Sequence, residues 1–214
     1  MNDPAEIPLW VKLVYTAFIA VWAPIYARHR GWANFMWFSD IGLIGTMIGL
    51  WLESALIIST MALAAIAGDL GWDAIAAWRG VRRLVRGRGS GAVFINDAAV
   101  PRYVRLFSLF HIFLPLVLLW AVWVLGYDAR ALPVMIFFGW GVLIATYLWT
   151  NPRENINCVF GVPPPPKFVT PRTWLMVVMI DYLFIMWWPT HAALQWWTSG
   201  TIARPASIVE NFTN

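Results

Sequence analysis

The sequence predicts an all-α protein, a polytopic bundle of about six membrane-spanning helices in a single domain. Of its 214 residues, 60% are hydrophobic and only 12% are charged, whereas soluble domains are roughly half apolar and a quarter charged. The apolar residues are grouped into segments whose lengths are near the ~20 residues that cross a bilayer as a helix. We place the spans near residues 9–26, 34–51, 54–70, 104–126, 131–150 and 173–197.

The spans pair into three helical hairpins. The second and third segments form a nearly continuous apolar run that is too long for one span, and residues 51–54 supply the turn, with Ser54 as the N-cap of the third helix. Residues 126–130 form a short turn before the fifth helix. Thr170 followed by Pro171 is typical of an N-cap and a first-turn proline, so the sixth helix is expected to begin there.

The second segment also carries a packing signal. Gly42, Gly45 and Gly49 cluster about half a turn away from Asp40. Small residues at this spacing let two membrane helices approach closely. We therefore expect this glycine face to pack against a neighbouring helix while Asp40 faces elsewhere.

Basic residues are distributed unevenly between the two ends of the predicted spans. Twelve lie in or beside the connections 27–33, 68–103 and 151–172, and three lie at the opposite ends. Because cytoplasmic loops carry the excess of lysine and arginine, both termini are expected outside the cytoplasm. The predicted location is the inner (cytoplasmic) membrane, with membrane lipids as partners. The net charge of +4 then requires no nucleic-acid partner.

Residues 71–103 are predicted to form an amphipathic surface helix followed by a linker. Apolar residues recur at helical spacing in 72–86, and four arginines lie largely on another face. This pattern is typical of a helix that lies on the cytoplasmic leaflet and is drawn to anionic headgroups. The lipid-surface residues are Arg79, Arg82, Arg83 and Arg86.

Several stretches resemble an uncharacterised family of bacterial multi-pass membrane proteins. They are Tyr26 to Ile41, Trp51 to Ser54, Leu106 to His111, Leu125 to Pro133, Asn155 to Gly161 and Pro189 to His191. The similarity covers most of residues 7–195. It implies a shared fold, and it implies no activity, because none is assigned to the family.

Three ionisable residues, Asp40, His111 and Asp181, lie inside three different apolar segments. A helical rise of 1.5 Å per residue puts all three roughly 9–12 Å below the cytoplasmic surface. A charged group at the centre of a span costs about 2.5–3.5 kcal/mol or more, so such groups usually face the protein interior or water. These residues are the candidates for catalysis and for binding a divalent metal. The candidate ligand-binding residues are Ser39, Ser108, Asn155, Asn157 and His191.

Three functions fit these features. The favoured one is a binding or accessory subunit that holds lipid, pigment or other membrane-protein subunits through its Trp-rich surface, with His111 or His191 available to a pigment metal. The alternative is a lipid-directed intramembrane enzyme, hydrolase-like, that uses Asp40, His111 and Asp181 beneath a lid of Asn155 and Asn157. A small transporter is the third.

No HExxH, P-loop or dinucleotide fingerprint supports an enzyme, and no motif requires a cofactor. Interhelical hydrogen bonding without chemistry explains the same residues.

Overall fold

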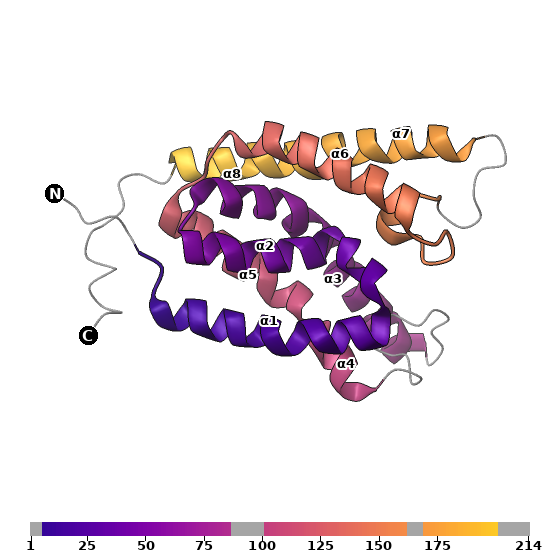
Figure 1. The fold of residues 1–214 in the computed structure, drawn as a ribbon, viewed down its shortest axis with the longest axis horizontal. Helices are drawn as coiled ribbons and strands as arrows, with labels where there is room; N and C mark the ends of the chain where they lie inside the picture. The colour runs from indigo at the N-terminus through magenta and orange to yellow at the C-terminus, as the bar shows by residue number, and fades with distance from the viewer. Residues whose placement is uncertain (1–5, 87–100, 162–168, 201–214) are drawn as a thin grey trace.

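The computed structural model describes residues 6–86, 101–161 and 169–200, and all regular elements in these ranges are helices (Figure 1). The α-helices are α1 (Leu9–Arg30), α2 (Phe38–Leu52), α3 (Ala55–Arg86), α4 (Arg102–Phe107), α5 (Phe110–Leu125), α6 (Ala131–Trp149), α7 (Pro171–Asp181) and α8 (Trp188–Gly200). Two short 3-10 helices, η1 (Trp32–Met36) and η3 (Ile156–Cys158), and a π-helical turn, η4 (Tyr182–Trp187), complete the fold. The predicted all-α class is confirmed for the described part of the chain.

Five helical stretches in these ranges are long and apolar enough to cross a membrane. They are Leu9–Arg30, Ala55–Ile75, Arg102–Leu125, Ala131–Trp149 and Pro171–Gly200. The remaining apolar helix, α2, has 15 residues, which at 1.5 Å per residue is roughly 22 Å and short of a hydrocarbon core of about 30 Å. The prediction of apolar spanning helices is therefore supported for five segments, and the number of complete crossings depends on α2.

The central helix of the bundle is α3, which packs against α2, α5 and α6. The most apolar 18-residue window of its membrane-length part, Ala55–Ile75, has 56% of its residues buried, more than the corresponding window of any of the other four stretches. The predicted glycine face forms the contact between α2 and α3: a Cβ atom at Gly42 would lie 2.8 Å from Cβ of Ala65, and one at Gly49 would lie 2.7 Å from Ile58. The absence of side chains on this face therefore sets the distance between the two helices.

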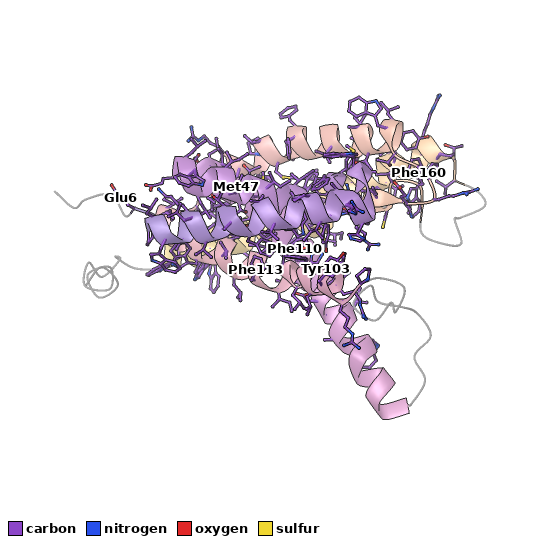
Figure 2. All side chains as sticks on the ribbon, turned by 60° about the horizontal axis from the view of Figure 1, so that its bottom comes forward. Glu6, Met47, Tyr103, Phe110, Phe113 and Phe160 are labelled. Atoms are coloured by element: carbon purple, nitrogen blue, oxygen red, sulfur yellow. The ribbon has the colours of Figure 1, made fainter. Side chains whose placement is uncertain are left out.

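The predicted boundary near residue 70 is not a helix end. Residues 55–86 form one helix of 32 residues, so the span and the amphipathic helix are continuous. No proline interrupts the sequence there, and isolated glycines such as Gly68 and Gly71 are tolerated inside a helix. Figure 2 shows the C-terminal part of α3 projecting away from the bundle. The side chains of Arg79, Arg82, Arg83 and Arg86 lie outside the described residues.

The last helical stretch bends through the π-helical turn η4. This turn brings the fully buried ring of Trp187 against Gly139 of α6. Phe38, at the start of α2, contacts the rings of Tyr182 and Trp187 at centroid distances of 4.9 and 5.7 Å. The start of α2 is thus fixed against the middle of the last helix, beside the pocket described below.

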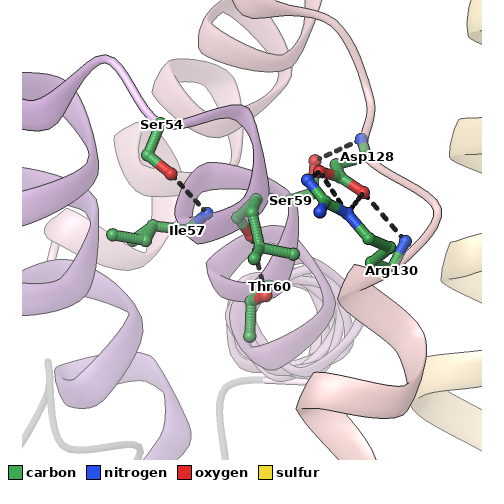
Figure 3. A network of polar contacts seen from close by, with 7 residues as sticks. Ser54, Ile57, Ser59, Thr60, Asp128 and Arg130 are labelled. Atoms are coloured by element: carbon green, nitrogen blue, oxygen red, sulfur yellow. Dashed lines mark hydrogen bonds and ion pairs between the residues drawn. The ribbon is translucent and has the colours of Figure 1, made fainter.

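Polar contacts also join helices at the end of the bundle where α2 meets α3 (Figure 3). The Ser54 hydroxyl accepts a hydrogen bond from the Ile57 amide, as expected of the predicted N-cap. The Asp128 amide donates to Ser59 at 3.0 Å, and Arg130 donates to the Asp128 carboxylate at 2.7 Å. The hydrogen bonds that Arg130 donates to the Asp128 carboxylate lower the pKa of Asp128 below its ordinary value. The hydrogen bond between Asp128 and Ser59 thus ties the turn before α6 to α3 at this end of the bundle.

Candidate functional site

A cavity of about 330 Å³ lies at the other end of the bundle, which we call the arginine-rich end. It is formed by the end of α1, by η1 and the start of α2, by the middle of α3, by the start of α5, by the η3 loop and by η4. Its volume is near the lower limit of roughly 300–1,000 Å³ for ligand sites. Its polar lining consists of Tyr26, Arg30, Asn34, Ser39, Asp40, Asp69, Ser108, His111, Asn157 and Tyr182.

A histidine–aspartate pair joins α5 to α3 inside this cavity. Nδ1 of His111 lies 2.8 Å from Oδ1 of Asp69, whose carboxylate is almost completely buried. The imidazole is held between two aromatic rings, with centroid distances of 4.7 Å to Trp72 and 4.1 Å to Phe110. The contact with Asp69 and the two neighbouring aromatic rings together fix the orientation of the His111 imidazole.

The second oxygen of the Asp69 carboxylate, Oδ2, is buried and has no hydrogen-bond partner among the described residues. Asp69 as a whole is 2% exposed and lines the cavity. A buried charged oxygen without a partner is costly, and such groups in native proteins usually contact a ligand, an ion or water.

Asp40 supplies a further buried carboxylate from the first turn of α2 and is 2% exposed. Its Oδ2 accepts a hydrogen bond from the Asn34 side chain of η1. The N-terminal end of a helix favours negative charge, which also stabilises this position. Asp40, Asp69 and Arg30 all line this one cavity.

Neutral hydroxyl groups complete the polar wall. The hydroxyl groups of Tyr26 and Ser108 are hydrogen-bonded at 2.8 Å and link α1 to the break between α4 and α5. Ser39 lines the cavity and is half-buried. These groups can donate or accept, so they place no fixed charge requirement on a ligand.

The two loop asparagines have different roles. Asn157 lines the cavity and is 1% exposed; its amide nitrogen donates to the Met36 carbonyl at 2.7 Å, and its oxygen accepts from the Phe38 amide at 3.3 Å. Asn155 instead bonds to Phe160 and Gly161 within its own loop. Both have positive φ, at 51° and 44°, a conformation that asparagine tolerates. Of the two asparagines, Asn157 lines the cavity and Asn155 does not.

The structure does not bring Asp181 into the cavity. Its side chain is exposed at the end of α7, although the neighbouring Tyr182 lines the cavity. His191 lies elsewhere in the last helical stretch, where Nδ1 contacts the Tyr127 hydroxyl at 2.7 Å. Within residues 6–86, 101–161 and 169–200, no three histidine, cysteine or acidic residues are grouped to hold a metal ion. The candidate metal set of Asp40, His111 and Asp181 is therefore not assembled.

The sequence reasoning did not identify Asp69, Tyr26 or Asn34 as site residues. Asp69 lies inside the predicted third span, 54–70, but only one residue from its end, so the depth estimate that selects Asp40, His111 and Asp181 does not select it. In the structure the apolar stretch runs to Ile75, which places Asp69 six residues from its end. Asp69 lies four residues after Ala65 and four before Asp73, so the three residues share one face of α3. This spacing is the sequence signal that could identify Asp69.

The chain matches no protein-family model, no curated protein and no solved structure. In the part of the chain that the structure describes, the fold is all-helical, with five helices long and apolar enough to span a membrane and a polar cavity at one end of the bundle.

Proposed function

We propose that this chain is an integral membrane protein of the bacterial inner membrane that binds a polar ligand, of the size of a lipid headgroup, in the cavity at its arginine-rich end. The observation that carries the proposal is the convergence of two buried carboxylates, Asp40 and Asp69, with His111 on one cavity. Burial of such groups costs several kcal/mol unless partners compensate for it. A protein that needed only helix packing would gain more from apolar residues at these positions.

The proposal includes six crossings with both termini outside the cytoplasm. In support, the Leu9 end of α1 and the Gly200 end of α8 lie at the same end of the bundle (Figure 1). The excess of basic residues belongs to the opposite end, which supports a position of the cavity at the cytoplasmic leaflet. The short helix α2 crosses as part of its tight hairpin with α3, preceded by η1.

The surface of the bundle supports the membrane location. Large apolar side chains are exposed on α1, α5, α6 and the last helical stretch, including Leu13, Leu116, Phe137 and Phe184. Exposed tryptophans near helix ends, such as Trp10, Trp149 and Trp196, fit the aromatic belts of membrane proteins. Contact with lipid is sufficient to explain this apolar surface. We therefore propose the cavity as the ligand site and propose no partner subunit that binds the exposed tryptophans.

A second candidate is an enzyme that acts on the bound lipid, and the orientation of His111 by Asp69 favours it. A carboxylate on one imidazole nitrogen is the usual support for a general base. No hydroxyl nucleophile is paired with this imidazole in the described part of the chain, since the Ser108 side chain bonds to Tyr26 instead. His111→Ala should then abolish turnover of a bound lipid in an assay of lipid products by mass spectrometry, whereas a binding protein produces none.

Gly68 offers a direct test of binding in the cavity. It lines the cavity, is exposed, and a Cβ atom there would meet nothing within 4 Å. Gly68→Trp therefore fills space without disturbing the packing of α3. Gly71→Trp is the matched control, because Gly71 is also exposed with nothing within 4 Å and does not line the cavity.

Native mass spectrometry of protein purified in a mild detergent measures the retained ligand. We expect a small polar molecule or lipid on the wild type and on Gly71→Trp, and its loss from Gly68→Trp. Equal retention by both variants would place the ligand outside the cavity and contradict the proposal, as would a wild-type protein that carries no ligand after purification from native membranes.

A further inference from the structure

The charge of the cavity indicates which ligands it accepts. Its deep wall carries two nearly fully buried carboxylates, Asp40 and Asp69. The cationic side chain of Arg30 lines the cavity but is exposed, so it marks the place where the cavity reaches the surface. The deep part therefore favours a positive group, and the rim favours a negative one.

The Oδ2 atom of Asp69 indicates which kind of positive group fits the deep part of the cavity. Oδ1 is used by His111 at 2.8 Å, while Oδ2 is buried without a partner among the described residues. A carboxylate oxygen accepts hydrogen bonds, and its strongest partners are charged N–H donors. A primary ammonium group has three N–H donors, whereas a quaternary ammonium has none. Among cationic groups, an ammonium that carries hydrogen can therefore donate to this oxygen, and a quaternary ammonium cannot.

Aromatic rings around the cavity suit the same group. Trp37, Trp72 and Tyr182 line it together with the carboxylates. A cation near the face of an aromatic ring is stabilised further when it is removed from water. The cavity volume of about 330 Å³ fits a headgroup and leaves acyl chains outside, next to the exposed apolar helices.

We infer that the cavity binds phosphoethanolamine, with its primary ammonium on Asp69 Oδ2 and its phosphate at Arg30. The inference rests on the proposed function and names its ligand class. The same chemistry occurs in phosphatidylethanolamine and in free phosphoethanolamine, and the experiment below distinguishes these two sources.

The test compares ligands on the full chain purified in detergent. Isothermal titration calorimetry is done with phosphoethanolamine, phosphocholine and inorganic phosphate, and native mass spectrometry is done from nanodiscs of phosphatidylethanolamine or phosphatidylglycerol. We expect phosphoethanolamine or its lipid to bind at least about tenfold more tightly than the choline or glycerol counterpart. Binding of the lipid but not of the free headgroup identifies the lipid source, and the reverse identifies a soluble ligand.

Variants locate the ammonium group. Asp69→Asn keeps the shape of the side chain and should weaken phosphoethanolamine binding at least about tenfold. Asp181→Asn, which removes an exposed carboxylate outside the cavity, should leave it within about twofold. Since Asp69→Asn also alters the contact with His111, Arg30→Gln provides a second probe at an exposed position. It should weaken phosphoethanolamine binding and should not weaken ethanolamine binding, because it removes a positive charge from the same cavity.

Equal binding of phosphocholine and phosphoethanolamine would overturn the inference, and so would wild-type affinity in Asp69→Asn. If Gly68→Trp expels a molecule that contains no ammonium group, the inference fails and the proposed function stands. If no molecule depends on the cavity, both fail.

Discussion

Gly42→Ala tests how closely α2 and α3 must approach to form the site. The added Cβ would lie 2.8 Å from Cβ of Ala65, and ordinary contact begins at 3.4 Å, so the two helices must separate by about 0.6 Å. Both atoms are attached directly to helix backbones, and neither can move away by changing a rotamer. Overpacking of this kind costs about 1–3 kcal/mol. The same displacement moves Asp40 relative to Asp69.

The control is Gly141→Ala in α6, where a Cβ meets nothing within 4 Å. Both substitutions gain the same helix propensity, up to about 1 kcal/mol, so their difference isolates the packing cost. Reversible unfolding in mixed detergent micelles should give Gly42→Ala a free energy of unfolding about 1–3 kcal/mol below that of Gly141→Ala. Equal stabilities of the two variants would refute the close approach.

Three further predictions follow from the loops. Asn157→Ala removes the hydrogen bonds to Met36 and Phe38 and should lower the free energy of unfolding by about 1–3 kcal/mol in the same assay, whereas Glu154→Ala, at an exposed position, should change it little. Burial raises the pKa of the Cys158 thiol above its ordinary value of 9.0, so at pH 7 the thiol is neutral and its maleimide labelling rate should still be rising at pH 9; a plateau below pH 9 would contradict the raised pKa. With Cys158 replaced by alanine, cysteines at Glu154 and Ala129 should label from opposite faces of the membrane with an impermeant maleimide, and labelling from one face would contradict six crossings.

Much of the helical arrangement follows from local sequence chemistry. Ser54 and Thr170 cap helices because their hydroxyl groups satisfy backbone amides, and both caps form as the sequence predicts. The Gly42 and Gly49 contacts are equally local in origin, because a side chain reduced to hydrogen leaves room for another helix. The full length of α3 does not follow from the sequence, because the change at residue 70 from apolar to amphipathic residues predicts two elements where the structure has one helix.

Depth along a helix can be counted from the sequence, but the direction in which a side chain points cannot be assigned without the packing partners. Counting put Asp40, His111 and Asp181 at one level. Asp40 and His111 line the cavity, and Asp181 points outward because its side of α7 has no neighbour that buries it. The partner of His111 is Asp69, a residue 42 positions away in the chain. Such a pairing depends on how α3 and α5 are placed together.

The most direct test of ligand binding is a crystal structure of the full chain grown from a lipidic mesophase doped with phosphatidylethanolamine. The account predicts ordered density in the cavity, with a nitrogen atom within hydrogen-bonding distance of Asp69 Oδ2 and a phosphate beside Arg30. A cavity that holds only water, with the Asp69 and Asp40 carboxylates bridged by it, would contradict the account.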